Sequence, residues 1–386
     1  MNNFLTRSIA FVFAMMLLFS AGAVVANEAK AESDLSLESK SAMLMEFESG
    51  DVLFGKDEKE HLPVASMVKM MTILIALEEF DAGNVALDTK ITTTENASSM
   101  GGSQVFLDAY QDYTFEQLFK SVVMASANDA SVALAEYFNG NEKAFVNRMN
   151  KKAKQLGMND THYANCTGLP APEQYSCAYD SAILLREVLK HDLYHNYSTI
   201  WMDTLLHPTG RETELVNTNR LIRYYEGCDG GKTGSTNEAG CCLTSSAKRG
   251  DMRLVSVVVG APNSKTRFNE SATLFNYGFA NYESKKLVDG TSALAQVKVA
   301  KGKEESVDVF AQESFSAVVK KGDNSNYQVD MQILPSVKAP MKAGQKVGSV
   351  AILKDGNIVK TIAVVVKNDV KALSWFETMD KILQKW

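Results

Sequence analysis

The chain has 386 residues, of which 45% are hydrophobic and 22% are charged, and its formal net charge is -6. This apolar content is enough for one large core and a smaller second one. A chain with this net negative charge lacks the excess of basic residues that nucleic-acid-binding proteins carry, so nucleic acid is not an expected partner.

The first element in chain order is a predicted export signal. Arg7 precedes an apolar run from Ile9 to Ala26, and both Val24-Val25-Ala26 and Ala29-Lys30-Ala31 resemble signal-peptidase sites. We therefore expect residues 1–31 to be a signal peptide. The alternative is an uncleaved transmembrane anchor, for which the run is barely long enough.

Strands and helices alternate in the next part of the chain. Ser41 to Phe54 alternates apolar and polar residues, which predicts a hairpin. The nearly apolar run from Ser66 to Phe80 predicts a buried helix, and Thr114-Phe115-Glu116-Gln117 is a capping box that opens another helix. The pattern from Leu221 to Val259 changes to the period of strands.

The C-terminal part has a different texture. Residues 283–369 alternate apolar and polar side chains and contain the hairpin signal Asp355-Gly356, so they predict a small all-β domain. In residues 370–386 the apolar residues fall at helical spacing, with charged residues opposite. Such a helix suits the surface of a membrane, and Trp375 and Trp386 near its ends favour that reading. The alternative is a helix packed on the protein itself or on a second copy.

A serine and a lysine lie three residues apart at the start of the first predicted helix, in Ser66-Met67-Val68-Lys69. A serine nucleophile needs a nearby base, and apolar surroundings lower the pKa of a lysine toward that role. Roughly one or two such matches are expected by chance in a chain of this length. A second match, Ser245-Ser246-Ala247-Lys248, ends a strand pattern, where residues three apart point to opposite faces, and we set it aside.

Two further motifs carry chemistry. Ser126-Ala127-Asn128 falls where a helix pattern breaks, and it predicts either a proton relay with an amide-binding side chain or simple helix capping. Lys232-Thr233-Gly234 is the most specific motif, expected by chance in roughly one chain in ten. On an edge strand its lysine and threonine would hold a carboxylate, and its glycine would admit a substrate backbone. The alternative is an exposed hairpin.

These three motifs, in this order, resemble the serine penicillin-recognising enzymes, most closely the low-molecular-mass D-alanyl-D-alanine carboxypeptidases. The separations of 60 residues from Ser66 to Ser126 and 106 residues from Ser126 to Lys232 fit that family. The resemblance implies an α/β (α+β) catalytic domain of the serine β-lactamase/DD-peptidase-like fold at residues 32–282, before the all-β domain and the amphipathic helix. Ser235 departs from the family, because many members carry a histidine there.

The resemblance also implies the roles of individual residues. Ser66 is the nucleophile, Lys69 the general base, and Ser126 the donor of a proton to the leaving D-alanine. The backbone N–H groups of Ser66 and Ser235 form the oxyanion hole. The implied substrate-binding residues are Asn128, Lys232, Thr233, Gly234, Ser235 and Arg267.

The implied substrate is the peptidoglycan stem pentapeptide, which loses its terminal D-alanine, and β-lactams would acylate the same serine. No cofactor or metal is expected. The export signal and the tail helix together predict a peripheral protein on the outer face of the cytoplasmic membrane, with the membrane surface as a partner.

Several alternatives stay open at this level. A class A β-lactamase is the nearest rival, although Glu173-Gln174-Tyr175-Ser176 does not match its Glu-x-x-Leu-Asn signature. Two further alternatives are binding proteins that do not turn over substrate, namely a penicillin sensor and an inactive peptidoglycan scaffold. A zinc peptidase is suggested by His191 and His195 around Asp192. The five cysteines allow bridges between Cys166 and Cys177, or from Cys228 to Cys241 or Cys242, or free thiols.

Overall fold

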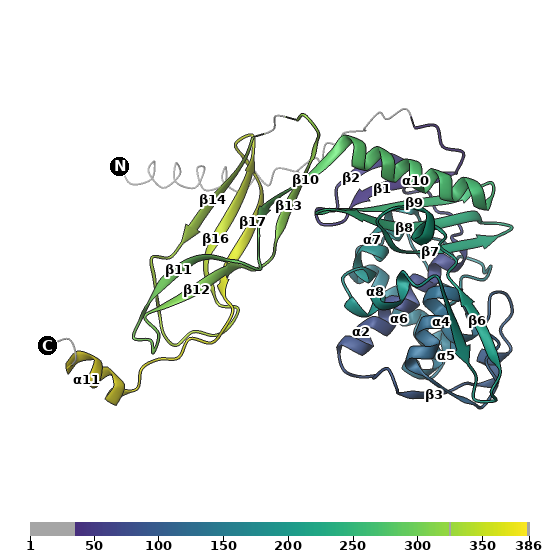
Figure 1. Ribbon diagram of the computed structural model, residues 1–386, viewed down its shortest axis with the longest axis horizontal. Helices are drawn as coiled ribbons and strands as arrows, with labels where there is room; N and C mark the ends of the chain where they lie inside the picture. Colours follow the sequence, from purple (N-terminus) through teal and green to yellow (C-terminus); the bar gives the residue numbers. More distant parts are fainter. Residues whose placement is uncertain (1–34, 324–325, 384–386) are drawn as a thin grey trace, which may run out of the picture. The chain divides into compact units, whose positions relative to one another are not determined.

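The computed structural model describes residues 35–323 and 326–383, so the predicted signal peptide lies outside the described residues. The first part of the described chain is built on an antiparallel five-stranded sheet with the order β2-β1-β9-β8-β7 (Figure 1). Its strands are β1 (Ser41–Glu46), β2 (Val52–Lys56), β7 (Cys228–Thr236), β8 (Gly240–Arg249) and β9 (Met252–Ala261). Strand β7 forms one edge of this sheet.

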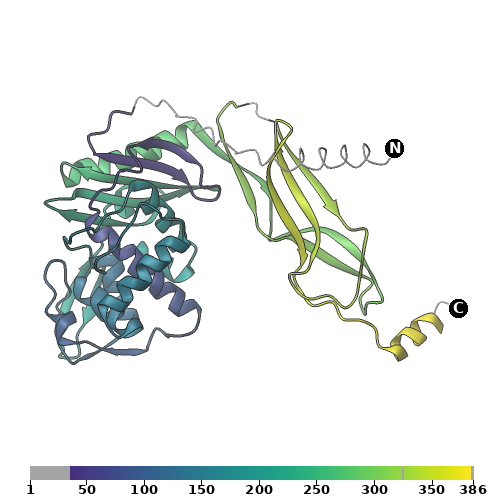
Figure 2. The ribbon, with the colours of Figure 1, turned by 180° about the vertical axis from the view of Figure 1, so that it is seen from behind.

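Helices cover both faces of this sheet, as Figures 1 and 2 show from opposite sides. Helix α10 packs along one face together with the short helix α9, whose Leu221 belongs to the same core as Leu274 of α10, and helices α2 to α8 lie on the opposite side. The helices are η1 (Ala65–Val68, a 3-10 turn), α2 (Lys69–Asp81), α3 (Glu95–Ser98), α4 (Phe115–Ala125), α5 (Asn128–Asn139), α6 (Glu142–Gln155), α7 (Ala178–Val188), α8 (Asp192–Ser198), α9 (Leu221–Tyr224) and α10 (Ser264–Asn281).

The sheet separates two apolar cores because successive strand residues point to opposite faces. Met43 of β1 pairs with Val257 of β9. Both side chains belong to the larger core, which lies between the sheet and helices α2 to α7. Their strand neighbours Leu44 and Val258 belong to the second core, together with Leu274 of α10. Helix α2 passes through the larger core, and its first nine residues are all buried.

The predicted elements of this part are largely confirmed. The hairpin is β1–β2, the apolar run is η1 followed by α2, and Thr114 forms the capping box of α4 with Gln117. One prediction was wrong: Leu221–Tyr224 forms the short helix α9 rather than a strand, and the strand pattern begins at Cys228. Two short strand pairs were not predicted, namely β3 (Lys90–Thr92) with β4 (Asp112–Thr114) and β5 (Met202–Leu206) with β6 (Glu212–Val216).

The all-β part confirms the reading of the C-terminal sequence. A six-stranded sheet with the order β14-β16-β17-β12-β11-β15 and a two-stranded sheet of β10 and β13 enclose a third apolar core. Asp355 and Gly356 both have positive φ, as a two-residue hairpin turn requires. The elements are β10 (Tyr282–Val288), β11 (Ala293–Ala300), β12 (Ser306–Ala311), β13 (Phe315–Lys320), β14 (Tyr327–Ile333), β15 (Ser336–Lys338), β16 (Lys346–Lys354), β17 (Asn357–Val366) and α11 (Trp375–Leu383).

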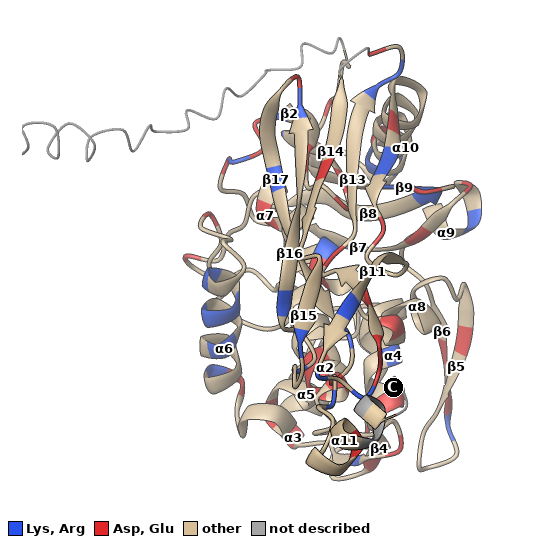
Figure 3. Cartoon of the chain, turned by 90° about the vertical axis from the view of Figure 1, so that its left-hand side faces the viewer, with Lys and Arg blue, Asp and Glu red and all other residues tan. Residues whose placement is uncertain are grey.

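Basic and acidic residues are interspersed along the helices and strands (Figure 3). Helix α6 is the most basic helix in that view, yet two of its cations are paired with acids of α2. Arg148 pairs with Glu79, and Lys152 lies 2.7 Å from Glu78. These pairs fix α6 against α2, so part of its positive charge is neutralised within the fold.

Candidate active site

The serine and lysine of the first motif meet where η1 passes into α2. Nζ of Lys69 lies 2.9 Å from Oγ of Ser66, and the Lys69 side chain is fully buried. Burial disfavours the ammonium form and lowers the pKa of Lys69 to about 7, and the negative charges that Cys166 and Asp129 can carry oppose this only in part. A lysine of this kind is a base at neutral pH, and its amine is placed against the hydroxyl that it would deprotonate.

The second and third motifs also meet, although 106 residues separate them. Ser126 ends α4 with a left-handed backbone (φ 61°), and its Oγ accepts a 2.6 Å hydrogen bond from Nζ of Lys232. The same Nζ donates to the Thr233 carbonyl oxygen at 3.1 Å. Burial holds the pKa of Lys232 well below its usual range, and the nearby cations Lys69 and Arg267 lower it further. Two hydroxyl–amine pairs therefore face one site.

The edge strand β7 brings the Lys232-Thr233-Gly234 motif against the nucleophile turn. Gly234 carries no Cβ, and a Cβ there would lie 2.4 Å from the Val64 carbonyl oxygen and 3.1 Å from the Ser66 nitrogen. Any other residue would push the strand away from η1. The prediction that the motif sits on an edge strand is confirmed, and the glycine is explained by this approach as well as by room for a substrate.

Two other predicted site residues border the same region. The Nδ2 group of Asn128 donates to the Gly101 carbonyl oxygen at 2.6 Å, whereas its buried Oδ1 has no hydrogen-bond partner. A buried acceptor of this kind is free to receive an N–H from a ligand. Arg267 donates from Nη1 to the carbonyl oxygens of Gly234 (2.9 Å) and Cys242 (3.3 Å), so α10 is tied to the end of β7.

Six of the nine predicted site residues line one cleft of about 610 Å³, namely Ser66, Ser126, Thr233, Gly234, Ser235 and Arg267, whereas Lys69, Asn128 and Lys232 are buried and are not part of its lining. Sequence reasoning missed the aromatic part of the cleft lining, where the rings of Trp201 and Tyr224 lie edge to face at 6.5 Å and the guanidinium of Arg223 lies 5.3 Å from the Trp201 ring. The described residues that line the cleft are Ser66, Ser103, Ser126, Trp201, Val216, Asn217, Thr218, Arg220, Tyr224, Thr233, Gly234, Ser235, Ser264 and Arg267. This lining includes no carboxylate and no histidine, and the two buried lysines reach it through their hydrogen bonds to Ser66 and Ser126.

The histidines of the zinc-peptidase alternative have other partners. Nδ1 of His191 lies 2.5 Å from Oδ2 of Asp81, and Nε2 of His195 lies 2.9 Å from the carbonyl oxygen of Leu189. Neither histidine lines the cleft. The nearest resemblance to a metal-ligand set in the described part of the chain lies elsewhere, at the start of α7.

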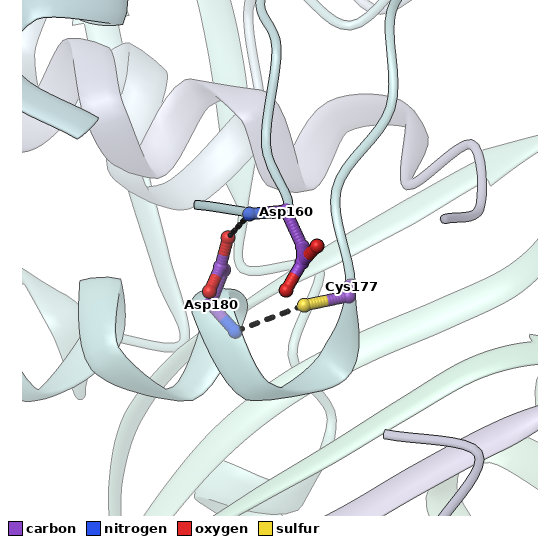
Figure 4. Close-up of side chains that lie close together, drawn as sticks. All are labelled: Asp160, Cys177 and Asp180. Carbon is purple, nitrogen blue, oxygen red and sulfur yellow. Dashed lines mark hydrogen bonds between the residues drawn. The ribbon is translucent and has the colours of Figure 1, made fainter. Parts of the chain in front are cut away.

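Figure 4 shows this group, which consists of Asp160, Cys177 and Asp180. Sγ of Cys177 accepts the Asp180 backbone N–H at 3.3 Å, and Oδ2 of Asp180 accepts from the Asp160 N–H at 2.9 Å and from Thr161 Oγ1 at 2.7 Å. These contacts are those of a helix N-cap joined to the preceding loop. All five cysteines, including Cys177, are free thiols.

Comparisons with known proteins agree over most of the chain. A family model described as D-alanyl-D-alanine carboxypeptidase matches residues 27–263, and one described as the C-terminal domain of penicillin-binding protein 5 matches residues 282–372. The D-alanyl-D-alanine carboxypeptidase DacF of Bacillus subtilis is 39% identical over 373 residues, which is 96% of this chain and 96% of that protein.

Solved structures give the same picture. Penicillin binding protein 5 from Haemophilus influenzae has a TM-score of 0.70 at 30% identity and covers 88% of this chain and 99% of its own. The D-alanyl-D-alanine carboxypeptidase DacD from Francisella tularensis has a TM-score of 0.68 at 30% identity and covers 88% of this chain and 95% of its own.

Proposed function

The chain belongs to the D-alanyl-D-alanine carboxypeptidase family, and from this membership we propose which residues of its cleft carry out the reaction. The protein is a serine-type D-Ala-D-Ala carboxypeptidase, a penicillin-binding protein of peptidoglycan metabolism. The observation that supports the residue roles is the pairing of Ser66 with Lys69, and of Ser126 with Lys232, at one cleft.

The first half of the reaction forms an acyl-enzyme. Ser66 Oγ attacks the carbonyl carbon of the penultimate D-alanine while Lys69 Nζ takes the hydroxyl proton. The backbone N–H groups of Ser66 and Ser235 stabilise the oxyanion. The peptide C–N bond then breaks, and Ser126 delivers a proton to the leaving amine as it receives one from Lys232. The proton needed by the leaving group thus comes from the second hydroxyl–amine pair.

Substrate binding uses the remaining groups of the cleft. The terminal carboxylate of the stem peptide would meet Lys232, Thr233 and Arg267, and an adjacent negative charge favours the charged form of a buried lysine. The free Oδ1 of Asn128 would accept the N–H of the substrate amide. Trp201 and Tyr224 would contact the part of the stem peptide that precedes the scissile bond, because their rings line the same cleft.

The second half of the reaction hydrolyses the acyl-enzyme and regenerates the free enzyme. After the D-alanine leaves, the proton that Lys69 took from Ser66 passes to Lys232, so both amines regain their starting states. Water then attacks the acyl carbonyl and gives a proton to Lys69, which returns it to the Ser66 oxygen as the ester bond breaks. A β-lactam would acylate Ser66 in the same way. The missing carboxylate in the cleft lining favours this carboxypeptidase over the β-lactamase alternative, because it removes the acidic base that class A enzymes place there.

The test of this function is a turnover assay. Purified protein is incubated with a synthetic stem pentapeptide that ends in D-Ala-D-Ala, and released D-alanine is measured with and without a chelator, while a parallel reaction follows the hydrolysis of penicillin. We expect equal release in both arms. Hydrolysis of penicillin without release of D-alanine would favour a β-lactamase, no reaction with either substrate would favour a scaffold, and loss of activity with chelator would favour a zinc peptidase.

The position of the protein in the cell is a further part of the proposal. Removal of residues 1–31 would leave a catalytic domain at 32–282, the all-β domain at 283–369 and the tail helix at 370–386. Trp375 and Phe376 of α11 are 70% and 78% exposed. Such a face suits insertion at a membrane surface, and it would hold the exported enzyme on the outer face of the cytoplasmic membrane. Among the described residues, none of the helices is both long and apolar enough to cross a bilayer.

Truncation after Lys371 is expected to release the protein from membranes, because it removes the exposed apolar face of α11. Sedimentation with phospholipid vesicles measures the bound fraction of the mature protein. A matched pair sharpens the test: glutamate at both Trp375 and Phe376 is expected to abolish binding, whereas glutamate at the exposed Ile358 and Val359 is expected to leave it unchanged. Equal pelleting of the full-length and truncated proteins would contradict the anchor.

A further inference from the structure

The loop behind the general base is closed by one side chain, Asn165. Its Oδ1 accepts the backbone N–H groups of Thr167 (3.1 Å) and Gly168 (2.7 Å) and the Thr167 hydroxyl (3.2 Å). Its Nδ2 donates to the Leu169 carbonyl oxygen at 2.9 Å. One carboxamide therefore makes four hydrogen bonds within a single turn, which is how asparagine fixes tight turns.

This turn delivers two backbone groups to the reacting pair. The Thr167 carbonyl oxygen accepts a 2.5 Å hydrogen bond from Nζ of Lys69. Gly168 has φ +82°, and a Cβ on it would lie 2.1 Å from the Ala65 carbonyl oxygen and 2.9 Å from the Ser66 nitrogen. The residues that Asn165 holds are thus the residues that touch the base and the nucleophile.

The nucleophile turn itself is constrained. Ala65 has φ 49°, a left-handed conformation that is strained for a residue with a Cβ and persists only when the surroundings impose it. The surroundings are two glycines: Gly168 packs on one side of the turn, and Gly234 packs close to Val64 and Ser66. The turn of Asn165 supplies one of these two supports.

A neutral primary amine has two N–H groups and one lone pair, so its orientation decides whether it acts as a base. When Lys69 donates one N–H to the Thr167 carbonyl, its lone pair can point to the Ser66 hydroxyl 2.9 Å away. As the Ser66 Oγ–carbon bond forms, the hydroxyl proton moves to this lone pair, and the resulting ammonium donates a stronger, charge-assisted hydrogen bond to the same carbonyl oxygen.

We propose that Asn165 is a positioning residue of the reaction, which orients the amine of Lys69 through the Thr167 carbonyl and holds Ser66 through Gly168. The inference rests on the proposed role of Lys69 as general base. Glu142 and Gln174 also brace this loop, since Glu142 Oε1 accepts the Cys166 N–H and Gln174 Oε1 accepts the Asn165 N–H, but neither contacts Thr167 or Gly168.

The charge around Lys69 sets the sign of the expected pH effects. Three titratable groups act on it, namely Cys166, Asp129 on α5 and Lys232 on β7. Glu142 lies behind the loop and accepts a hydrogen bond from the Cys166 thiol. Loss of the Thr167 acceptor would destabilise the ammonium, so the acid limb of the rate profile would move to lower pH. A carboxylate at position 165 would stabilise the ammonium, so the limb would move to higher pH.

The experiment measures the rate constant of acylation by a fluorescent penicillin between about pH 5.5 and pH 9.5, and kcat and KM for D-alanine release. For Asn165→Ala we expect acylation and kcat to fall about 10- to 100-fold with KM within about threefold, and the acid limb to move down. For Asn165→Asp, which keeps the acceptor atoms, we expect recovery to within about tenfold of the wild type with the limb moved up.

The matched control is Asn150→Ala. Asn150 bonds the Tyr163 N–H and carbonyl of the same loop at 2.9 and 2.8 Å, away from Lys69, so its loss should lower stability without moving the limb. A normal rate for Asn165→Ala, or a slower rate with an unmoved limb, would overturn the proposal. If Asn165→Ala fails to fold, an unmoved limb in Asn165→Asp overturns it. Absence of acylation in the wild type would instead refute the proposed function.

Discussion

Replacing Ser66 by alanine is expected to abolish the acyl-enzyme and to lower D-alanine release by about 10⁴-fold or more, because no other hydroxyl in the cleft pairs with Lys69. The substitution removes one oxygen from a half-buried side chain, so the fold should persist. The measurements are initial rates of D-alanine release and labelling by fluorescent penicillin.

The matched control for this substitution is Ser99→Ala, which changes an exposed serine after α3 and should retain both activities. The thermal unfolding midpoints of both variants should stay close to that of the wild type. A Ser66→Ala protein that still releases D-alanine at more than about a hundredth of the wild-type rate would show that the nucleophile lies elsewhere.

Replacing Lys69 by methionine is expected to slow acylation of Ser66 by about 10²- to 10⁴-fold, the usual contribution of a general base. The buried amine is replaced by an apolar chain of similar length, so the protein should remain folded. In the wild type only the neutral amine accepts the serine proton. The acylation rate should therefore rise with pH through about 7, where Lys69 loses its proton, and level off above it. The variant should lack this limb.

Lys248→Met supplies the control, because Lys248 belongs to the second Ser-x-x-Lys match but is exposed on β8. We expect that variant to keep the wild-type rate and pH profile. A Lys69→Met protein with the wild-type limb would assign the titration to another group, of which Lys232 is the nearest candidate.

Local sequence signals predicted the elements that position the site. The apolar run after Ser66 predicted a buried helix, the Thr114 capping box predicted the start of α4, and the end of the helical pattern predicted the break at Ser126. The fold class, the all-β domain and the edge position of Lys232 are likewise confirmed. The helix at Leu221–Tyr224 was missed because a single turn is too short to show a helical period.

The contacts between distant segments could not be predicted from spacing. Nothing in the local sequence places Lys232 on Ser126, and only the family resemblance suggested it. The left-handed backbone conformation of Ala65 is unfavourable for alanine and could not be predicted from the residue type. Packing against Gly168 imposes it. Asn165 and Gly168 did carry a turn signal, but a turn signal does not say what the turn touches.

Peptide mapping after reaction with a labelled penicillin tests the central claim most directly. The wild-type protein is acylated, denatured and digested, and mass spectrometry locates the adduct. We expect one adduct per chain, on the peptide that contains Ser66, and none in Ser66→Ala. An adduct on a peptide that lacks Ser66, or no adduct on active enzyme, would contradict the account.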